Sequence, residues 1–355
     1  MKSTILFKSL KMAAIFSLAL GLIFTSCRKS GNSTPPTDKT ALQKAVDTAQ
    51  FYYANTLEGT KPGDYTVGAK TNLKTALDAA KAILTDPTST QATLTNAAAN
   101  LQGAINAYKA AYIGQIAAAN LIGFWKFNGN AADSSGNSNN GVITQGHAYY
   151  GAGTPTLTND RFGRANMAYH FDKGGNMEVP YVAQLNPQAF SISLWCKKDT
   201  AGRTINTDTY TLFAMDRWNG YKLQYQSANK IFFTVKGVLG TDTAFYDRDD
   251  VTAVLTNEVW YHVVVTFKAG EMDFYINGDP VKSWLDTPHP PITLSTPINI
   301  TIGQDLPTSK YLTVDGDWQV KWGGFFTGDM DDVMFYNIPL TAPQVHSIFV
   351  NQNTL

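Results

Sequence analysis

A pair of carboxylate side chains can hydrolyse a glycosidic bond when one acts as acid and the other as base or nucleophile. The chain has only four glutamates, and no two of them lie within seven residues of each other: Glu58, Glu178, Glu258 and Glu271. Two adjacent aspartate pairs, 249–250 and 331–332, would point to opposite faces of a strand. The spacing therefore favours a protein that is not an enzyme. A pair assembled from distant loops remains the alternative.

The histidines and cysteines indicate no catalytic or metal chemistry. No histidine stands at metal-ligand spacing from another, the five being His147, His170, His262, His289 and His346. His262 lies within an apolar run, WYHVVV, where a hydrogen-bonded core residue is the simpler interpretation. Cys196 falls on the apolar side of an alternating strand, so packing is expected rather than nucleophilic chemistry.

Aromatic side chains in loop-like stretches could bind sugar, since a ring can stack on the apolar face of a pyranose beside polar groups. The candidate ligand-binding residues are Trp218, Tyr246, Trp284, Asp315, Asp317, Trp318 and Trp322. The segment DGDWQVKW at 315–322 is the richest of these clusters. The competing interpretation for each ring is local packing under a long loop.

Length and composition set the wider limits. The chain has 355 residues, no net charge and a pI near 7.0, with 44% hydrophobic and 12% aromatic residues. That is enough apolar material for two or three domains, and it excludes wholesale disorder. The neutral balance argues against a nucleic-acid partner. Two cysteines exclude a disulfide-dense scaffold.

Residues 1–27 are predicted to be a signal peptide. Lys2, Lys8 and Lys11 precede an apolar run from 12 to 24 that is short for a membrane span. The run ends in FTSC, which resembles a bacterial lipobox and implies lipidation of Cys27. An ordinary secretory signal with an incidental cysteine is the alternative. Residues 28–37 are polar and rich in Pro and Gly, as expected of a flexible tether.

Residues 38–118 are predicted to form three amphipathic helices. Apolar residues recur every three or four positions in three series, and these are separated by Pro62-Gly63 and by Asp86-Pro87. Short loops between such helices give a small antiparallel bundle. The pattern from Tyr65-Thr66 through Leu73 to Ala104-Ile105 resembles the FIVAR module of bacterial surface proteins. The resemblance implies a spacer.

Residues 120–355 change to the pattern of a β-sandwich. Short β-branched and aromatic runs are bounded by Gly, Asn, Asp and Pro, and the run FSISLWC at 190–196 alternates as a half-buried strand does. Asn277-Gly278 is a type I′ hairpin signal. Antiparallel sheets are expected, as in a sandwich or jelly roll. Extra loops are expected within 148–165, 199–209 and 236–256.

Five blocks in this region resemble LamG-like, concanavalin A-type jelly rolls. They are LIGFWKFNGNAADSSGNSNNG (121–141), FSISLWCK (190–197), WYHVVVTFKAGEMDFYINGDPV (260–281), INITIGQD (298–305) and FTGDMDDVMFYNIPLTAPQV (326–345). The resemblance implies an all-β jelly-roll sandwich preceded by the three-helix bundle. Enzymes of this fold carry a compact Glu-x-Asp-x-x-Glu arrangement, which is absent here.

The resemblance also implies a structural calcium ion as the cofactor. Related jelly rolls hold calcium between the first segment and the closing strand, and the matching positions are Asn128, Gly129, Asp133 and Asp331. If Asp331 shares a strand face with Val333 and Phe335, its carboxylate approaches the core and needs a metal or several N–H donors. A simple turn at 133–137 is the alternative.

Together these features predict a lipoprotein that binds polysaccharide. The resemblances imply an outer-membrane lipoprotein of the Bacteroides group, anchored through Cys27 at the cell surface, that presents a LamG-like jelly roll on a helical spacer. An anchor on the periplasmic side is the alternative. Its expected partners are a glycan and the membrane that holds its lipid anchor, with a further protein partner at the cell envelope left open. The alternatives are a protein-binding adhesion or structural module, and then a glycoside hydrolase on the same fold. A fold alone does not decide among them.

Overall fold

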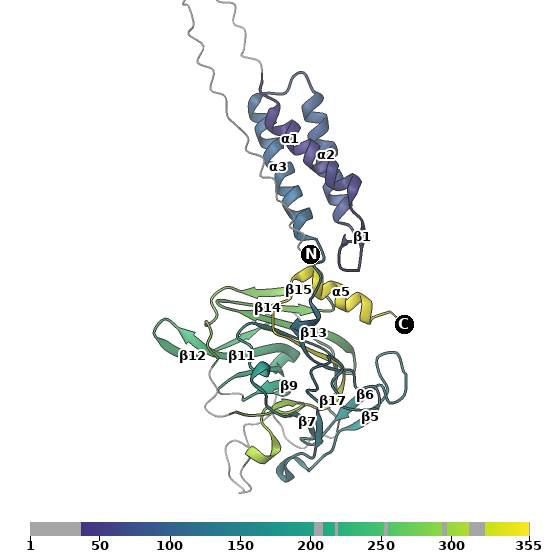
Figure 1. Cartoon of the computed structure of the whole chain (residues 1–355), viewed down its shortest axis with the longest axis vertical. Helices are drawn as coiled ribbons and strands as arrows, with labels where there is room; N and C mark the ends of the chain where they lie inside the picture. Colours follow the sequence, from purple (N-terminus) through teal and green to yellow (C-terminus); the bar gives the residue numbers. More distant parts are fainter. Residues whose placement is uncertain are drawn as a thin grey trace, which may run out of the picture.

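Three helices stand at one end of a two-sheet sandwich (Figure 1). The structure is a computed structural model, and it describes residues 37–201, 209–216, 219–251, 255–292, 297–311 and 324–354. Within these ranges no helix has the length and the apolar composition that crossing a membrane requires. The all-β sandwich preceded by a three-helix bundle agrees with the sequence prediction.

The helical module consists of α1 (Thr40–Asn55), α2 (Ala69–Thr85) and α3 (Gln91–Ala110). Two short parallel strands, β1 (Glu58–Gly59) and β2 (Tyr65–Thr66), lie between the first two helices. The apolar stripes expected from the sequence meet in one core, in which Leu42, Leu73 and Leu94 are each 1% exposed. Thr90 caps α3 by accepting a hydrogen bond from the Thr93 amide at 3.2 Å.

Two antiparallel sheets form the sandwich. The first, called the seven-stranded sheet, contains in spatial order β12 (Asp242–Asp249), β11 (Lys230–Leu239), β10 (Tyr221–Gln226), β9 (Tyr210–Met215), β16 (Ile300–Ile302), β7 (Asn176–Val179) and β4 (Val142–Thr144). The second, called the eight-stranded sheet, contains β15 (Asp279–Trp284), β14 (Glu271–Ile276), β13 (Trp260–Lys268), β8 (Phe190–Lys198), β17 (Gly328–Tyr336), β6 (Ala168–Phe171) and β5 (Thr156–Thr158), with β3 (Leu121–Trp125) paired to β17.

Short 3-10 turns connect several of these strands, at Ala118–Asn120, Ala148–Tyr150, Ala183–Leu185, Ser227–Asn229 and Thr308–Lys310.

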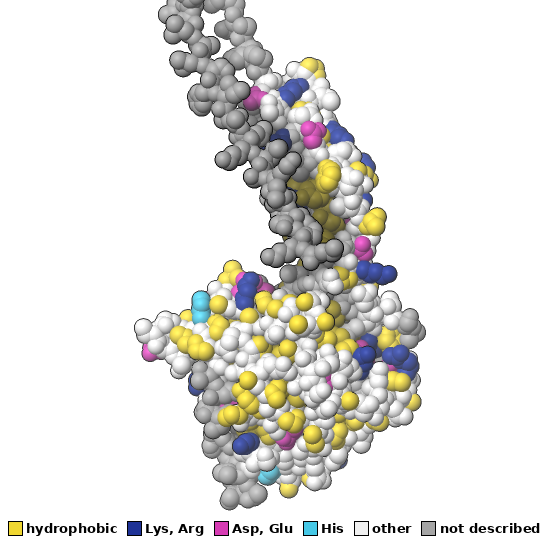
Figure 2. All heavy atoms as spheres, in the orientation of Figure 1, with side chains coloured by type: hydrophobic (Ala, Val, Ile, Leu, Met, Phe, Trp, Pro, Cys, Tyr) yellow, Lys and Arg dark blue, Asp and Glu magenta, His cyan; other side chains and the backbone are white. Residues whose placement is uncertain are grey.

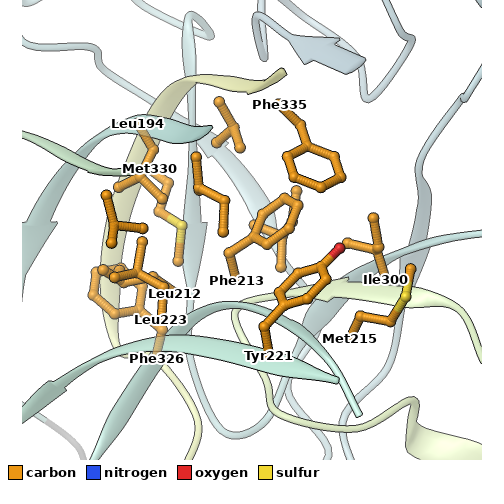
Figure 3. Packing of buried hydrophobic residues seen from close by; sticks show 14 of the residues in the cluster. Leu194, Leu212, Phe213, Met215, Tyr221, Leu223, Ile300, Phe326, Met330 and Phe335 are labelled. Carbon is orange, nitrogen blue, oxygen red and sulfur yellow. The ribbon is translucent and has the colours of Figure 1, made fainter. Parts of the chain in front are cut away.

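The core lies between the two sheets and is dominated by aromatic rings. Phe213 and Phe335, from opposite sheets, approach to 5.2 Å between ring centroids, and Tyr221 lies 6.0 Å from Phe335 (Figure 3). All three side chains are fully buried. Rings of this size bury the apolar area that holds two sheets together.

The local predictions for the sandwich are largely confirmed. Cys196 is fully buried in the core and Trp195 faces the other way, as alternation requires. Asn277 and Gly278 have φ of 51° and 83°, which gives the two-residue hairpin between β14 and β15. One strand was not expected from the sequence: within 236–256, residues 242–249 form β12 and pair with β11.

A fourth described helix, α5 (Ala342–Gln352), lies between the sandwich and the helical module (Figure 1). Val345 packs in a small apolar cluster on the outer face of the eight-stranded sheet. From its other side α5 reaches the helical module, where Ser347 and Asn351 donate to the Thr60 carbonyl, and the segment after α3, where Gln344 donates to the Gly114 carbonyl at 3.1 Å. The helix thus joins the two modules.

Candidate functional site

The outer face of the seven-stranded sheet carries a row of polar side chains. Cross-strand pairing places Thr301, Ala214, Lys222, Thr234 and Asp247 next to one another in that order, across five strands. Three of them, Thr301, Lys222 and Thr234, are buried. Thr234 donates a hydrogen bond to the Asp247 carboxylate at 2.7 Å. A sheet face that is polar and yet buried is unusual, because polar side chains are buried only when something satisfies them.

A second row on the same face holds polar atoms that no described residue satisfies. Thr211, Gln224 and Phe232 lie opposite one another on β9, β10 and β11. Among the residues that the structure describes, the buried Oγ1 of Thr211 and the buried Oε1 atoms of Gln224 and Gln226 have no hydrogen-bond partner. Leaving such an atom unpaired costs about 1–3 kcal/mol. Ligand hydroxyl groups could supply the missing donors.

Two aromatic rings lie on the same outer face, and Phe232 is the one beside these polar atoms. Phe232 is half-buried beside Gln224, and Phe245 is 45% exposed next to Lys236, whose ammonium lies 5.3 Å from the ring centroid. The predicted ligand-binding residues all came from loop-like stretches, so the sequence did not indicate Phe232, Phe245, Gln224 or Thr211. The signal was present in YKLQYQ at 221–226, where lysine and two glutamines alternate with buried apolar residues.

Arg248 contacts two of the predicted ligand-binding residues, Tyr246 and Trp284. Tyr246 and Trp284 lie on β12 and β15, the edge strands of the two sheets. The guanidinium of Arg248 stacks on both, with its Cζ 4.3 Å from the Tyr246 centroid and 4.8 Å from the Trp284 centroid. Trp284 also donates from Nε1 to the Asp249 carbonyl at 2.9 Å. These contacts form an aromatic cluster at the edge where the two sheets meet.

The other predicted ligand-binding residues lie outside the described part of the chain. They are Trp218, Asp315, Asp317, Trp318 and Trp322. The same holds for Cys27, the predicted lipidation site. Each of these assignments stays a prediction.

Asp133, a predicted calcium ligand, is held by protein donors. Its Oδ1 accepts hydrogen bonds from the amides of Phe124 and Ser135, at 2.9 and 2.8 Å. Its Oδ2 accepts from the Ser135 hydroxyl and the Asn139 amide, also at 2.8 and 2.9 Å. Four donors satisfy the carboxylate and fix the turn at 133–137.

Asp331 is compensated by an arginine. A register shift between β17 and β8 turns Asp331 to the side of Trp195, away from the core side chains Val333 and Phe335. The expected shared face is therefore wrong, because the shift inserts a residue, Asp332, whose φ is 46°. Arg161 forms an ion pair with the Asp331 carboxylate and another, at 2.9 Å, with Asp332.

The ion cluster of Arg161, Asp331 and Asp332 is largely shielded from solvent. The Arg161 side chain is 5% exposed and the Asp331 side chain 3%. Burial and the neighbouring Asp332 charge raise the pKa of Asp331, and the Arg161 guanidinium opposes that shift. Arg161 also donates to the Gln352 carbonyl and lies 4.5 Å from the Trp195 ring, so the cluster attaches the end of α5 to the sheet.

These contacts bear on the calcium prediction. Among the described residues, no group of three or more His, Cys, Asp or Glu side chains is arranged to hold a metal ion. Calcium at Asp133 or Asp331 would compete with the donors just described, so the residues do not fit the ion as they stand. Calcium binding stays a prediction, tested by whether calcium raises the melting temperature of metal-stripped protein.

A pair of carboxyl groups from distant segments meets in the described part of the chain. Glu258 shares a side-chain hydrogen bond with Asp199, and burial together with this contact raises the pKa of Glu258. Glycoside hydrolases separate their two carboxyl groups by about 5 to 9.5 Å so that a glycosidic bond fits between them. A directly hydrogen-bonded pair leaves no such space, and this arrangement does not resemble a hydrolase site.

The buried histidine and cysteine have structural surroundings. Burial lowers the pKa of His262 to about 3, and its Nε2 lies 2.9 Å from the Ser193 hydroxyl. Burial raises the pKa of the Cys196 thiol to about 12. A neutral imidazole and a protonated thiol agree with the packing roles expected from the sequence.

Two segments match known protein families. Residues 38–109 match the FIVAR domain. Residues 171–346 match the concanavalin A-like lectin/glucanases superfamily. A curated relative, a gellan lyase from a Bacillus species, is 45% identical over 74 residues, which are 21% of this chain. The chain spans only 3% of that relative's length.

Solved structures with a similar fold include the following three domains. Domain 4 of an extracellular arabinanase from Geobacillus stearothermophilus, in complex with arabinotriose, is 20% identical, with a TM-score of 0.46 over 64% of this chain and 97% of that one. The binding domain of Paraclostridial Mosquitocidal Protein 1 is 16% identical, with a TM-score of 0.45 over 66% and 53%. The botulinum neurotoxin serotype C1 binding domain is 18% identical, with a TM-score of 0.45 over 67% and 53%. These likenesses concern the fold alone.

Proposed function

Because the chain consists of a FIVAR domain and a sandwich of the concanavalin A-like lectin/glucanases superfamily, we propose that it binds polysaccharide without cleaving it. The binding surface is the outer face of the seven-stranded sheet around Thr211, Gln224 and Phe232. Lipid on Cys27 holds the protein at the outer membrane, and the helical module acts as a spacer between the membrane and the sandwich.

One observation carries this proposal: three polar atoms on that face are buried and unpartnered among the described residues. A buried polar atom without a partner calls for an explanation, and a bound ligand is one that would supply the partner. Two of them are amide oxygens, which accept hydrogen bonds, and sugar hydroxyl groups donate them. Phe232 beside Gln224 supplies the apolar surface on which a sugar ring rests.

The surface charge is compatible with a sugar ligand. Acidic and basic side chains are interspersed on the face of the molecule in view, without a large patch of one sign (Figure 2). A polymer with many hydroxyl groups binds through many directed hydrogen bonds and does not need such a patch.

Affinity electrophoresis of residues 28–355 in gels containing single polysaccharides tests the binding. We expect one or more glycans to retard the protein, and Gln224→Ala to reduce the retardation. A control variant, Asn130→Ala, alters an exposed amide in the loop after β3 and should behave as the unchanged protein. Retardation by no glycan would refute the proposal, and release of reducing sugar would refute its non-catalytic part.

The anchor is tested separately. We expect the full chain to incorporate labelled fatty acid and to fractionate with the outer membrane, and Cys27→Ser to do neither. Protease added to intact cells distinguishes the cell surface from the periplasmic side.

A further inference from the structure

The two aromatic rings at the sheet edge do not offer bare faces to a sugar. Arg248 stacks on both Tyr246 and Trp284, as described above. The ammonium of Lys282 lies over the Trp284 ring as well, 4.3 Å from its centroid. We call Tyr246, Arg248, Trp284 and Lys282 the cation–aromatic ladder. Because cations cover these rings, the ladder suits an anionic group better than a stacked neutral sugar.

Strand geometry fixes the ladder. Tyr246 and Arg248 are two residues apart on β12, so they share a face, and Lys282 and Trp284 do the same on β15. The hydrogen bond from Trp284 Nε1 to the Asp249 carbonyl ties the two edge strands together. The two cations are therefore held by rigid elements rather than by long loops.

The charges of the ladder do not cancel. Asp286 accepts two hydrogen bonds from Arg248, at 3.3 Å from Nε and 2.7 Å from Nη2. Lys282 has no such counter-ion: among the described residues, its ammonium makes no ion pair or hydrogen bond, only the contact with the indole ring. A ring holds an ammonium in place without adding a negative charge.

The ladder borders the proposed binding face. Alternate residues of β12 point to opposite sides, so Phe245 and Asp247 face the polar rows while Tyr246 and Arg248 belong to the ladder. Arg248 therefore lies around the edge strand from the polar rows, on the side of that strand where Lys282 and Trp284 of β15 also lie.

We propose that the ladder binds the carboxylate of a uronic acid residue, so that the glycan recognised by this protein is an acidic polysaccharide. This inference rests on the proposed function and specifies its ligand class. The carboxylate accepts hydrogen bonds from the Lys282 ammonium. It thereby gives Lys282 the counter-ion that Asp286 gives Arg248. Such charge-assisted bonds are about twice as strong as neutral ones.

Matched polymers test this inference. Residues 28–355 are run in gels containing polygalacturonate, alginate or hyaluronate, each beside its methyl ester, which keeps the sugar chain and removes the charge. We expect at least one acidic polymer to bind about tenfold more tightly than its ester. Lys282→Gln should abolish that difference, and Lys282→Arg should preserve it.

Lys268→Gln serves as the control, because Lys268 is another surface lysine, already paired with Glu271 at 2.9 Å. An equal loss in the Lys268 and Lys282 variants would mean general charge attraction and would overturn the inference. Binding that is equal for acid and ester would overturn it too. Retention by neutral glycans alone would overturn the acidic subsite while leaving the proposed function standing, and retention by no glycan would overturn both.

Discussion

Gln224 on β10 lies directly opposite Phe232 on β11. A buried amide oxygen with no hydrogen-bond partner in the described part of the chain therefore stands beside an aromatic ring on the outer face of the seven-stranded sheet. A glutamine or a phenylalanine alone in a strand would not indicate a binding site. Their adjacency matters because a sugar offers hydroxyl donors at its edge and an apolar surface on its ring.

Replacing Gln224 separates binding from stability. In Gln224→Leu the unpaired amide oxygen is lost and the side chain stays similar in size, so the free energy of unfolding should stay level or rise by about 1 kcal/mol. Glycan affinity should fall about tenfold. Losing one hydrogen bond costs about 1 kcal/mol of binding free energy, and about 1.4 kcal/mol is a tenfold change in affinity. Urea unfolding and affinity electrophoresis measure the two effects. Parallel losses of stability and binding would show that the amide is structural.

Removing Arg161 should destabilise the sandwich. In Arg161→Leu the Asp331 and Asp332 carboxylates stay buried without their cation, which costs about 3–5 kcal/mol. The end of α5 should loosen as well, because Arg161 donates to the Gln352 carbonyl. Urea unfolding gives the loss of stability, and hydrogen exchange of α5 amides shows the loosening.

A double variant tests the cause of that loss. Arg161→Leu combined with Asp331→Leu removes a buried charge of each sign, so part of the stability should return. If the double variant is as unstable as the sum of two independent losses, the ion pair is not what the arginine contributes.

His170 should make stability depend on pH. Its hydrogen bond to Asp329, at 2.7 Å, raises the pKa of His170 against the effect of burial, and Asp172 and Asp199 contribute in the same direction. Because the folded protein holds the proton more tightly, the stabilisation is complete below the unfolded pKa of about 6.5 and is lost as pH rises through the folded value.

We therefore expect the free energy of unfolding to decline from pH 6 to pH 9 more in the unchanged protein than in His170→Gln. The difference should stay below about 1 kcal/mol, because the imidazole is partly exposed to solvent. Parallel curves for the two proteins would contradict this assignment. Chemical unfolding at a series of pH values provides the measurement.

The Cys196 thiol should be inert while the protein is folded. Burial raises its pKa to about 12, and the side chain is fully inside the core. In residues 28–355, which lack Cys27, a thiol reagent at pH 8 should label nothing until denaturant is added, and should then label one thiol per chain. Rapid labelling of the folded protein would show that the core around Cys196 opens to solvent, which would contradict the prediction.

Much of the fold is predictable because it depends on local periodicity. Three helical stripes, the alternation of 190–196 and the Asn277-Gly278 turn each follow from residues close in sequence, and the structure contains all of them. Strand β10 shows the same alternation in its sequence, YKLQYQ, so its polar face could also be read from residues close together in the chain. That face was not predicted as a binding site, because aromatic residues in loop-like stretches were the candidates.

Other features depended on which distant strands meet. The extra residue at Asp332 reversed the face of Asp331, and the arginine that compensates Asp331 lies 170 residues earlier in the chain. No spacing rule connects those positions, because sheet order brings them together.

The sequence by itself determined the two modules, the strand faces and the hairpin, since backbone periodicity and turn chemistry act over a few residues. Only the tertiary structure decided that Arg248 stacks on both Tyr246 and Trp284, that Gln224 stands beside Phe232, and that Asp331 has an arginine for its partner. Those relationships arise from strand order, register and bulges, which long-range packing selects from many arrangements that satisfy the same local pattern.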